Sequence, residues 1–250
     1  MKIKKILFGF AMLAMMGISS QAFAQFEGHI AMKLNSEVSP GKYEANEMNL
    51  YVTGNRIFLQ GDQSVNFSDD LDASGLLIRN DRKDFIVLMG ENKGLQFTKE
   101  ELEGFFQMAG MMAGDNSDVD VDSNTDYRYT DRTKTIMGYE CAELLIENTQ
   151  SNNSMSIWLT SGIDINWGML AEPWKNVPES MRESSSRLTQ EFKSKSFPML
   201  IEVNEKGNKE TVFEVTNVNK SSIAKAMVEI PSGVNLMGLQ EFIFSMMMGN

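Results

Sequence analysis

The chain has 250 residues, of which 34 are acidic and 23 are Lys or Arg, so its formal net charge is −11 at pH 7. A chain of this length forms one domain with a full core, or at most two small ones, and its negative field argues against nucleic acid and anionic lipid surfaces as partners. The single cysteine cannot form an intramolecular disulfide, which leaves packing as the source of stability.

Residues 1–24 have the three regions of a signal peptide. Three lysines lie within the first five residues, and an apolar stretch from Ile6 to Ile18 follows that is too short to cross a membrane. Ala22-Phe23-Ala24 predicts cleavage between Ala24 and Gln25. We therefore expect an exported, periplasmic protein whose single α+β domain spans residues 25–250. Cleavage would change the net charge from −11 to −14, because three lysines and no acidic residue are lost.

The first half of this domain shows the period-two alternation of antiparallel strands. Short apolar runs are separated by polar turns that contain Gly, Asn or Pro, which favours a meander over βαβ units. The predicted strands are 26–34, 48–52, 57–59, 76–79, 85–89 and 95–97.

A helix is predicted where the period changes. Thr98 and Glu101 form a capping box, in which each side chain accepts a hydrogen bond from the other residue's backbone N–H. Gly114 is a plausible end of this helix. Apolar residues recur at helical spacing and predict a buried face rich in Phe and Met. They are Leu102, Phe105, Phe106, Ala109 and Met112, with Met108 and Met111 on the flank.

The second half repeats the order of strands, helix and strands. A second helix is predicted after Pro178, with a narrow apolar stripe. The segment 239–248 is apolar on nearly every side and must be buried, in this chain or another. The predicted strands are 127–136, 140–147, 155–160, 199–203, 211–215 and 226–230.

The central segment resembles the signature of a known family. Thr133 to Cys141 matches the pattern T-x-x-I-x-G-Y-x-C before a strand, and the strand 156–160 after it is similar too. The opening strand 26–32 and the closing segments 197–218 and 228–233 also resemble this family, an exported bacterial domain of unknown function (number 4412). The acidic loop 115–126 and the Met-rich terminus depart from its pattern.

This resemblance implies a fold similar to that of the periplasmic lipoprotein carriers (LolA-like). We therefore expect a strongly curved antiparallel sheet, an open half-barrel, with two or three helices on its concave side. The resemblance implies no catalytic residue and no cofactor.

Catalysis finds little support in the residues. His29 is the only histidine, so a histidine general base would have to be that residue. The chain has no G-x-S-x-G, P-loop or G-x-G-x-x-G motif. Cys141 has no nearby His or Arg in the sequence that would lower its pKa, and we interpret it as a small buried apolar residue. We expect a protein that is not an enzyme.

Two metal hypotheses arise from the sequence. Asp118 to Asp122 alternates acids like the start of a calcium loop, but Ser123 stands where an EF-hand needs Gly and Tyr129 where it needs Glu. A looser calcium site in the loop 115–126 stays open. The clustered methionines offer thioethers to Cu(I), although methionine more often fills irregular apolar space. We predict no metal site.

The preferred hypothesis is a non-catalytic carrier of a lipid or acyl chain. A helix rich in Phe and Met above a concave sheet would line an adaptable pocket, with tryptophans at its rim. The alternative is an interaction module for a protein of the cell envelope, which would use the apolar segment 239–248. The predicted ligand-binding residues are Phe105, Phe106, Met108, Met111, Met112, Trp167, Met169 and Trp174.

Overall fold

The structure is a computed structural model, and it describes residues 25–39, 42–68, 71–90, 92–113, 125–148, 153–175, 190, 196–205 and 207–248. The predicted signal peptide therefore lies outside the described residues, as do nearly all of the acidic loop 115–126 and of the helix predicted after Pro178. Cleavage after Ala24 stays a prediction.

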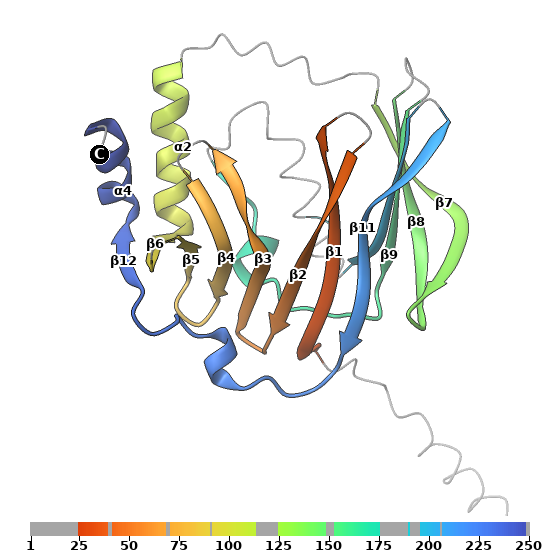
Figure 1. The fold of residues 1–250 in the computed structure, drawn as a ribbon, viewed down its shortest axis with the longest axis horizontal. Helices are drawn as coiled ribbons and strands as arrows, with labels where there is room; N and C mark the ends of the chain where they lie inside the picture. The colour runs from red at the N-terminus through yellow and green to blue at the C-terminus, as the bar shows by residue number, and fades with distance from the viewer. Residues whose placement is uncertain are drawn as a thin grey trace, which may run out of the picture.

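The described residues form one twelve-stranded sheet (Figure 1). Its order is β12-β6-β5-β4-β3-β2-β1-β11-β10-β9-β8-β7, and all pairs are antiparallel except the parallel pair of β12 and β6. The strands are β1 (Gly28–Ser39), β2 (Lys42–Val52), β3 (Arg56–Ser68), β4 (Leu71–Arg79), β5 (Asp84–Met89), β6 (Lys93–Thr98), β7 (Thr125–Ile136), β8 (Tyr139–Asn148), β9 (Ser154–Thr160), β10 (Phe197–Glu205), β11 (Asn208–Asn219) and β12 (Asn235–Gly238). The α-helices are α2 (Lys99–Ala113) and α4 (Leu239–Met248), and the 3₁₀ helices are η1 (Gly168–Ala171) and η2 (Lys225–Val228).

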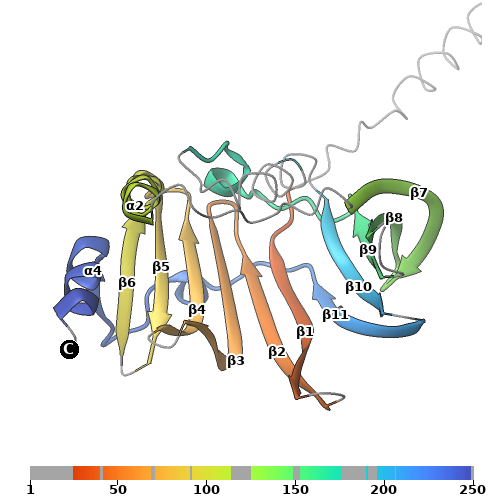
Figure 2. The same ribbon diagram turned by 90° about the horizontal axis from the view of Figure 1, so that it is seen from above.

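The sheet is curved and open, which confirms the predicted α+β class. Figure 2 shows the sheet bending upward toward β7 to β9, with α2 and η1 above its concave side. Helix α4 instead lies beside β12, at the edge of the sheet. Among the described residues, no helix is both long and apolar enough to cross a bilayer.

Alternating residues of the central strands build two separate apolar layers. In β3, Ile57 and Leu59 belong to the main core, whereas Phe58 between them packs on the opposite face. That opposite, convex face is covered by the segment that joins β11 to β12, through Val228 and Ile230. The period-two pattern thus produces a sheet whose middle strands are covered on both sides.

The predicted strands 127–136 and 140–147 are joined by a tight turn. Met137 and Gly138 join β7 to β8 with φ values of 52° and 84°, as a two-residue hairpin with two positive φ angles requires. The capping box also forms, because Glu101 N donates to Thr98 Oγ1 at 3.1 Å and Thr98 N donates to Glu101 Oε2 at 2.8 Å.

One prediction near the C-terminus was wrong. Residues 226–230 do not form a strand, because this segment crosses the convex face as η2 and its Val228 oxygen accepts from Arg56. The segment 239–248, predicted to be buried in this chain or another, forms α4, and within this chain its Phe244 is 65% and its Met248 63% exposed. The strand β12 was not predicted, because its pairing with β6 involves only four residues.

Candidate ligand site on the concave face

A segment that follows β9 in the chain lies across the concave face; we call residues 163–175 the strap. It includes η1, which Figure 2 shows above the middle of the sheet. Ile163, Ile165 and Met169 are buried in the main core. At the start of the strap, Phe26 N donates to the Asp164 oxygen at 2.6 Å. The aperiodic apolar pattern of this segment is therefore explained by a strap that inserts isolated side chains into the core.

Two asparagines fix the strap to turns at one end of the sheet. Asn80 Nδ2 donates to the Asn166 oxygen at 3.2 Å, and Met169 N donates to Asn80 Oδ1 at 3.3 Å. Asn166 Nδ2 donates to the Gly54 oxygen at 2.9 Å. Gly168 lies against Asn80 with φ +50°, and a Cβ there would come within 2.1 Å of Asn80 Oδ1, so only glycine fits.

The two strap tryptophans contact rings of the core. Trp167 stacks on Phe197 with a centroid distance of 6.4 Å and an interplanar angle of 10°. Trp174 lies 6.3 Å from Phe85, measured between ring centroids. Trp167, Met169 and Trp174, which the sequence predicted at a rim, thus lie along the strap against the closed part of the core.

The inward face of α2 is more polar than the sequence pattern predicted. Among the α2 side chains that the structure describes, Lys99 and Glu103 are the buried ones, whereas Phe105 and Phe106 are half-buried and lie 6.3 Å apart between ring centroids. Met108 is 46% exposed. The side chains of the other two predicted helix residues, Met111 and Met112, lie outside the described part of the structure.

Part of the concave apolar surface is only partly covered. Four apolar side chains of this face pack against the main core but are only half-buried, whereas the core side chains beneath the strap are buried. These four come from strands β2, β3, β4 and β6. The residues are Met48, Leu59, Leu76 and Phe97.

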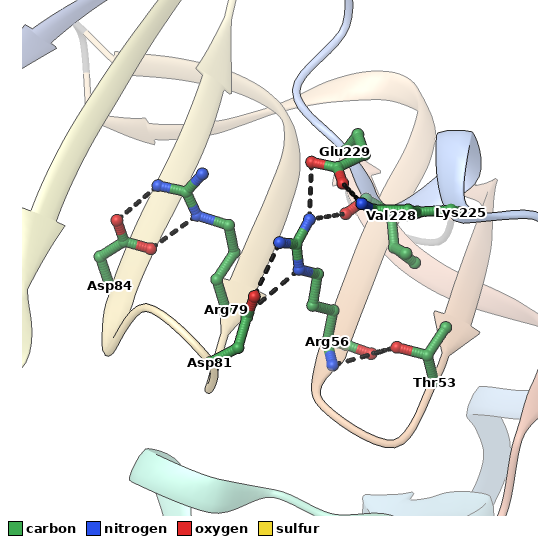
Figure 3. Close-up of polar contacts among 8 residues, drawn as sticks. All are labelled: Thr53, Arg56, Arg79, Asp81, Asp84, Lys225, Val228 and Glu229. Carbon is green, nitrogen blue, oxygen red and sulfur yellow. Dashed lines mark hydrogen bonds and ion pairs between the residues drawn. The ribbon is translucent and has the colours of Figure 1, made fainter.

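Buried arginines on the convex face form a structural clamp (Figure 3). Arg56 donates to Asp81 through Nε at 3.0 Å and Nη2 at 2.8 Å, and its Nη1 lies 2.6 Å from Glu229 Oε2. The hydrogen bond to Asp81 is the main cause of a raised pKa for Arg56, and the hydrogen bond from Arg56 lowers the pKa of both Asp81 and Glu229. All of these charges are paired, and the clamp fixes η2 to the sheet.

A second polar cluster lies on strands β7 to β10. Glu143 is fully buried and accepts hydrogen bonds from Arg132, at 2.5 Å from Nε, and from Thr130 Oγ1 at 2.6 Å. The indole of Trp158 donates to Glu202 at 2.8 Å. Here too the cations face carboxylates, which indicates a structural network.

The other residues considered for chemistry have structural contacts. His29 Nε2 lies 2.7 Å from Asn49 Oδ1, and the ring of His29 stacks on that of Tyr51 with centroids 4.8 Å apart. Burial raises the pKa of the Cys141 thiol, which disfavours the reactive thiolate. Among the residues that the structure describes, no group of His, Cys, Asp or Glu side chains is arranged to hold a metal ion.

Comparison with known families and structures gives one family match. The family called "Domain of unknown function (DUF4412)" matches residues 26–234, which includes every strand except β12. The sequence matches no curated protein.

Several solved structures are similar to the chain at low identity. An uncharacterized conserved protein from Thermus thermophilus is 7% identical, with a TM-score of 0.43 over 86% of this chain and 92% of that one. A LolA superfamily protein from Nitrosomonas europaea is 11% identical, with a TM-score of 0.30 over 82% and 91%. The Pseudomonas aeruginosa MucA/MucB complex contains a chain that is 11% identical, with a TM-score of 0.38 over 85% of this chain and 57% of that one.

Proposed function

The chain belongs to the DUF4412 family, a domain of unknown function, and from its structure we propose that it binds an apolar molecule, such as a lipid or acyl chain, on the concave face. The supporting observation is that apolar side chains of the concave face stay half-buried, as do Phe105 and Phe106 of α2. Together with the predicted signal peptide, this describes a carrier or sensor in the periplasm.

Burial of apolar surface would supply the binding energy. Each methylene removed from water contributes about 0.8 kcal/mol, so a chain of about ten methylenes gains roughly 8 kcal/mol before the costs of association. The strap supports this mechanism because its hydrogen bonds to Asn80 fix one wall of the site. Helix α2 supplies the other wall.

The proposal needs no catalytic group. The buried ionisable residues Arg79, Asp84 and Glu143 have partners of opposite charge or hydrogen-bonding hydroxyls, as structural residues do. A site built for acid–base chemistry would instead place such a group where a substrate can reach it.

Extraction of the purified full chain with organic solvent, followed by mass spectrometry, tests the proposal. We expect a lipid or fatty acid at a stoichiometric amount. A protein stripped of this material should bind an added fluorescent fatty acid and release it to unlabelled competitor. An empty extract together with no binding of the fluorescent fatty acid would rule out a carrier.

A second candidate function is supported by the outer face of α4. Phe244 and Met248 lie one turn apart, and both are largely exposed. An exposed apolar pair of this kind suits contact with an envelope protein. Deleting residues 239–250 should then abolish capture of a partner that full-length protein retains. Unchanged capture by a stable truncated protein would exclude this segment as the docking site.

A further inference from the structure

Helix α2 is attached to the strap by a buried ammonium group. Lys99 is buried on the inward face of the helix, and its Nζ lies 5.0 Å from the centre of the Trp174 ring. This Nζ also donates to three main-chain oxygens of the strap, at 3.4, 3.2 and 3.0 Å. Those oxygens belong to Met169, Glu172 and Pro173.

A carboxylate one turn later makes a second attachment. Glu103 is buried, and its Oε1 accepts a hydrogen bond from Lys175 N at 2.9 Å. The carboxylate of Glu172 also lies 3.6 Å from Lys99 Nζ, but it is 67% exposed, and such a surface ion pair contributes little. The attachment therefore depends on main-chain groups of the strap and on two side chains of α2.

We propose that Lys99 and Glu103 form a latch that controls how fast an apolar ligand enters and leaves the concave face; this inference rests on the proposed function. Phe105 and Phe106 lie within one turn of Glu103, so any movement of this part of α2 moves both rings. The latch holds α2 on the fixed strap, and its release lets the helix move away from the half-buried apolar surface. Hydrogen bonds to a charged donor are strong, so this attachment opens rarely.

Replacing Lys99 with Met tests the latch, because Met keeps the apolar stem and removes the charge. Exchange of a fluorescent fatty acid, followed by stopped flow, should become roughly 10- to 100-fold faster, the size expected for the loss of a charge-assisted hydrogen bond. Glu172→Gln is the matched control. It removes only the exposed charge, so its exchange rate should stay within about twofold of wild type.

Hydrogen exchange separates the latch from the proposed function. The amides of the strap, including Lys175 N–H, should exchange faster in Lys99→Met than in Glu172→Gln, whether or not fatty acid binds. If the wild-type protein binds no fatty acid, the proposed function fails and amide exchange still decides the latch. Unchanged amide and fatty acid exchange in a folded Lys99→Met protein would overturn the latch.

A milder variant covers the case in which Lys99→Met does not fold. Glu103→Met removes only the acceptor for Lys175 N. It should accelerate fatty acid exchange by a smaller factor, whereas Glu103→Gln keeps an acceptor oxygen and should resemble wild type. Equal rates for Glu103→Met and Glu103→Gln would contradict the role of Glu103.

Discussion

Replacing Asp84 with Ala is expected to lower the free energy of unfolding by about 3–5 kcal/mol, because the variant leaves the buried Arg79 without its counter-charge. The side chains of Arg79 and Asp84 are only 4% and 7% exposed. Arg79 donates to Asp84 from Nε at 2.7 Å and from Nη2 at 2.5 Å, and Gln96 Nε2 donates to the same carboxylate at 2.7 Å (Figure 3 shows the first two residues). Urea unfolding of the purified protein measures the loss.

Asp81→Ala is the matched control, because it removes the same side chain from a more exposed ion pair. Arg56 keeps Glu229 as a partner in this variant, so the expected loss is about 1 kcal/mol. The double variant Arg79→Met/Asp84→Leu should recover most of the stability, since apolar replacement removes the buried charge altogether. Equal losses for Asp84→Ala and Asp81→Ala would show that burial does not determine the cost.

Loss of Arg132 should lower the stability of the protein more than loss of its partner Glu143. Arg132 is 61% exposed, whereas Glu143 is fully buried. Arg132→Met therefore leaves a buried carboxylate, and we expect it to cost about 3 kcal/mol at pH 7. Glu143→Gln leaves an arginine that can turn into water, so its expected cost is about 1 kcal/mol. A larger loss for Glu143→Gln than for Arg132→Met would contradict this account.

The cost of Arg132→Met should also depend on pH. Burial raises the pKa of Glu143, but hydrogen bonds from Thr130, Ser156 and Arg132 outweigh this effect and hold the pKa below its usual range. In the wild type, the resulting stability is present above the unfolded pKa of about 4.3 and is lost as the pH falls through the folded value. Without Arg132 the pKa of Glu143 in the folded protein rises. Protonation of Glu143 then removes the unpaired buried charge and lowers the stability cost of the substitution. The stability difference measured at pH 7 should therefore shrink at pH 4, and a constant difference would argue against a buried charged carboxylate.

Signals that act over a few residues were readable from the sequence. The short apolar run 57–59 predicted a strand, and the predicted strands 127–136 and 140–147 are joined in the structure by the tight turn at Met137-Gly138. The capping box placed the start of α2 at the correct residue. In each case the residues that carry the signal also make the contacts, so no distant partner is needed.

The inward face of α2 could not be predicted in the same way. Lys99 and Glu103 one turn apart are typical of a solvated helix surface. They are buried because the strap, which is 70 to 74 residues away along the chain at these contacts, presents main-chain oxygens and an N–H to them. Likewise, Arg56 and Val228 are 172 residues apart, and no local pattern marks this contact. Lys99, Glu103 and Arg56 are therefore buried because distant segments supply their partners.

Titration of the stripped protein with a fluorescent fatty acid tests binding on the concave face most directly when two variants are compared. Phe105→Gln/Phe106→Gln places two polar side chains beside the site and keeps a good helix former. Met227→Gln changes a 42% exposed methionine of η2, on the segment that covers the convex face. We expect the double variant to bind at least about tenfold more weakly, from the loss of two apolar contacts, and Met227→Gln to bind like wild type. Equal affinities for all three proteins, or a loss confined to Met227→Gln, would contradict a site on the concave face.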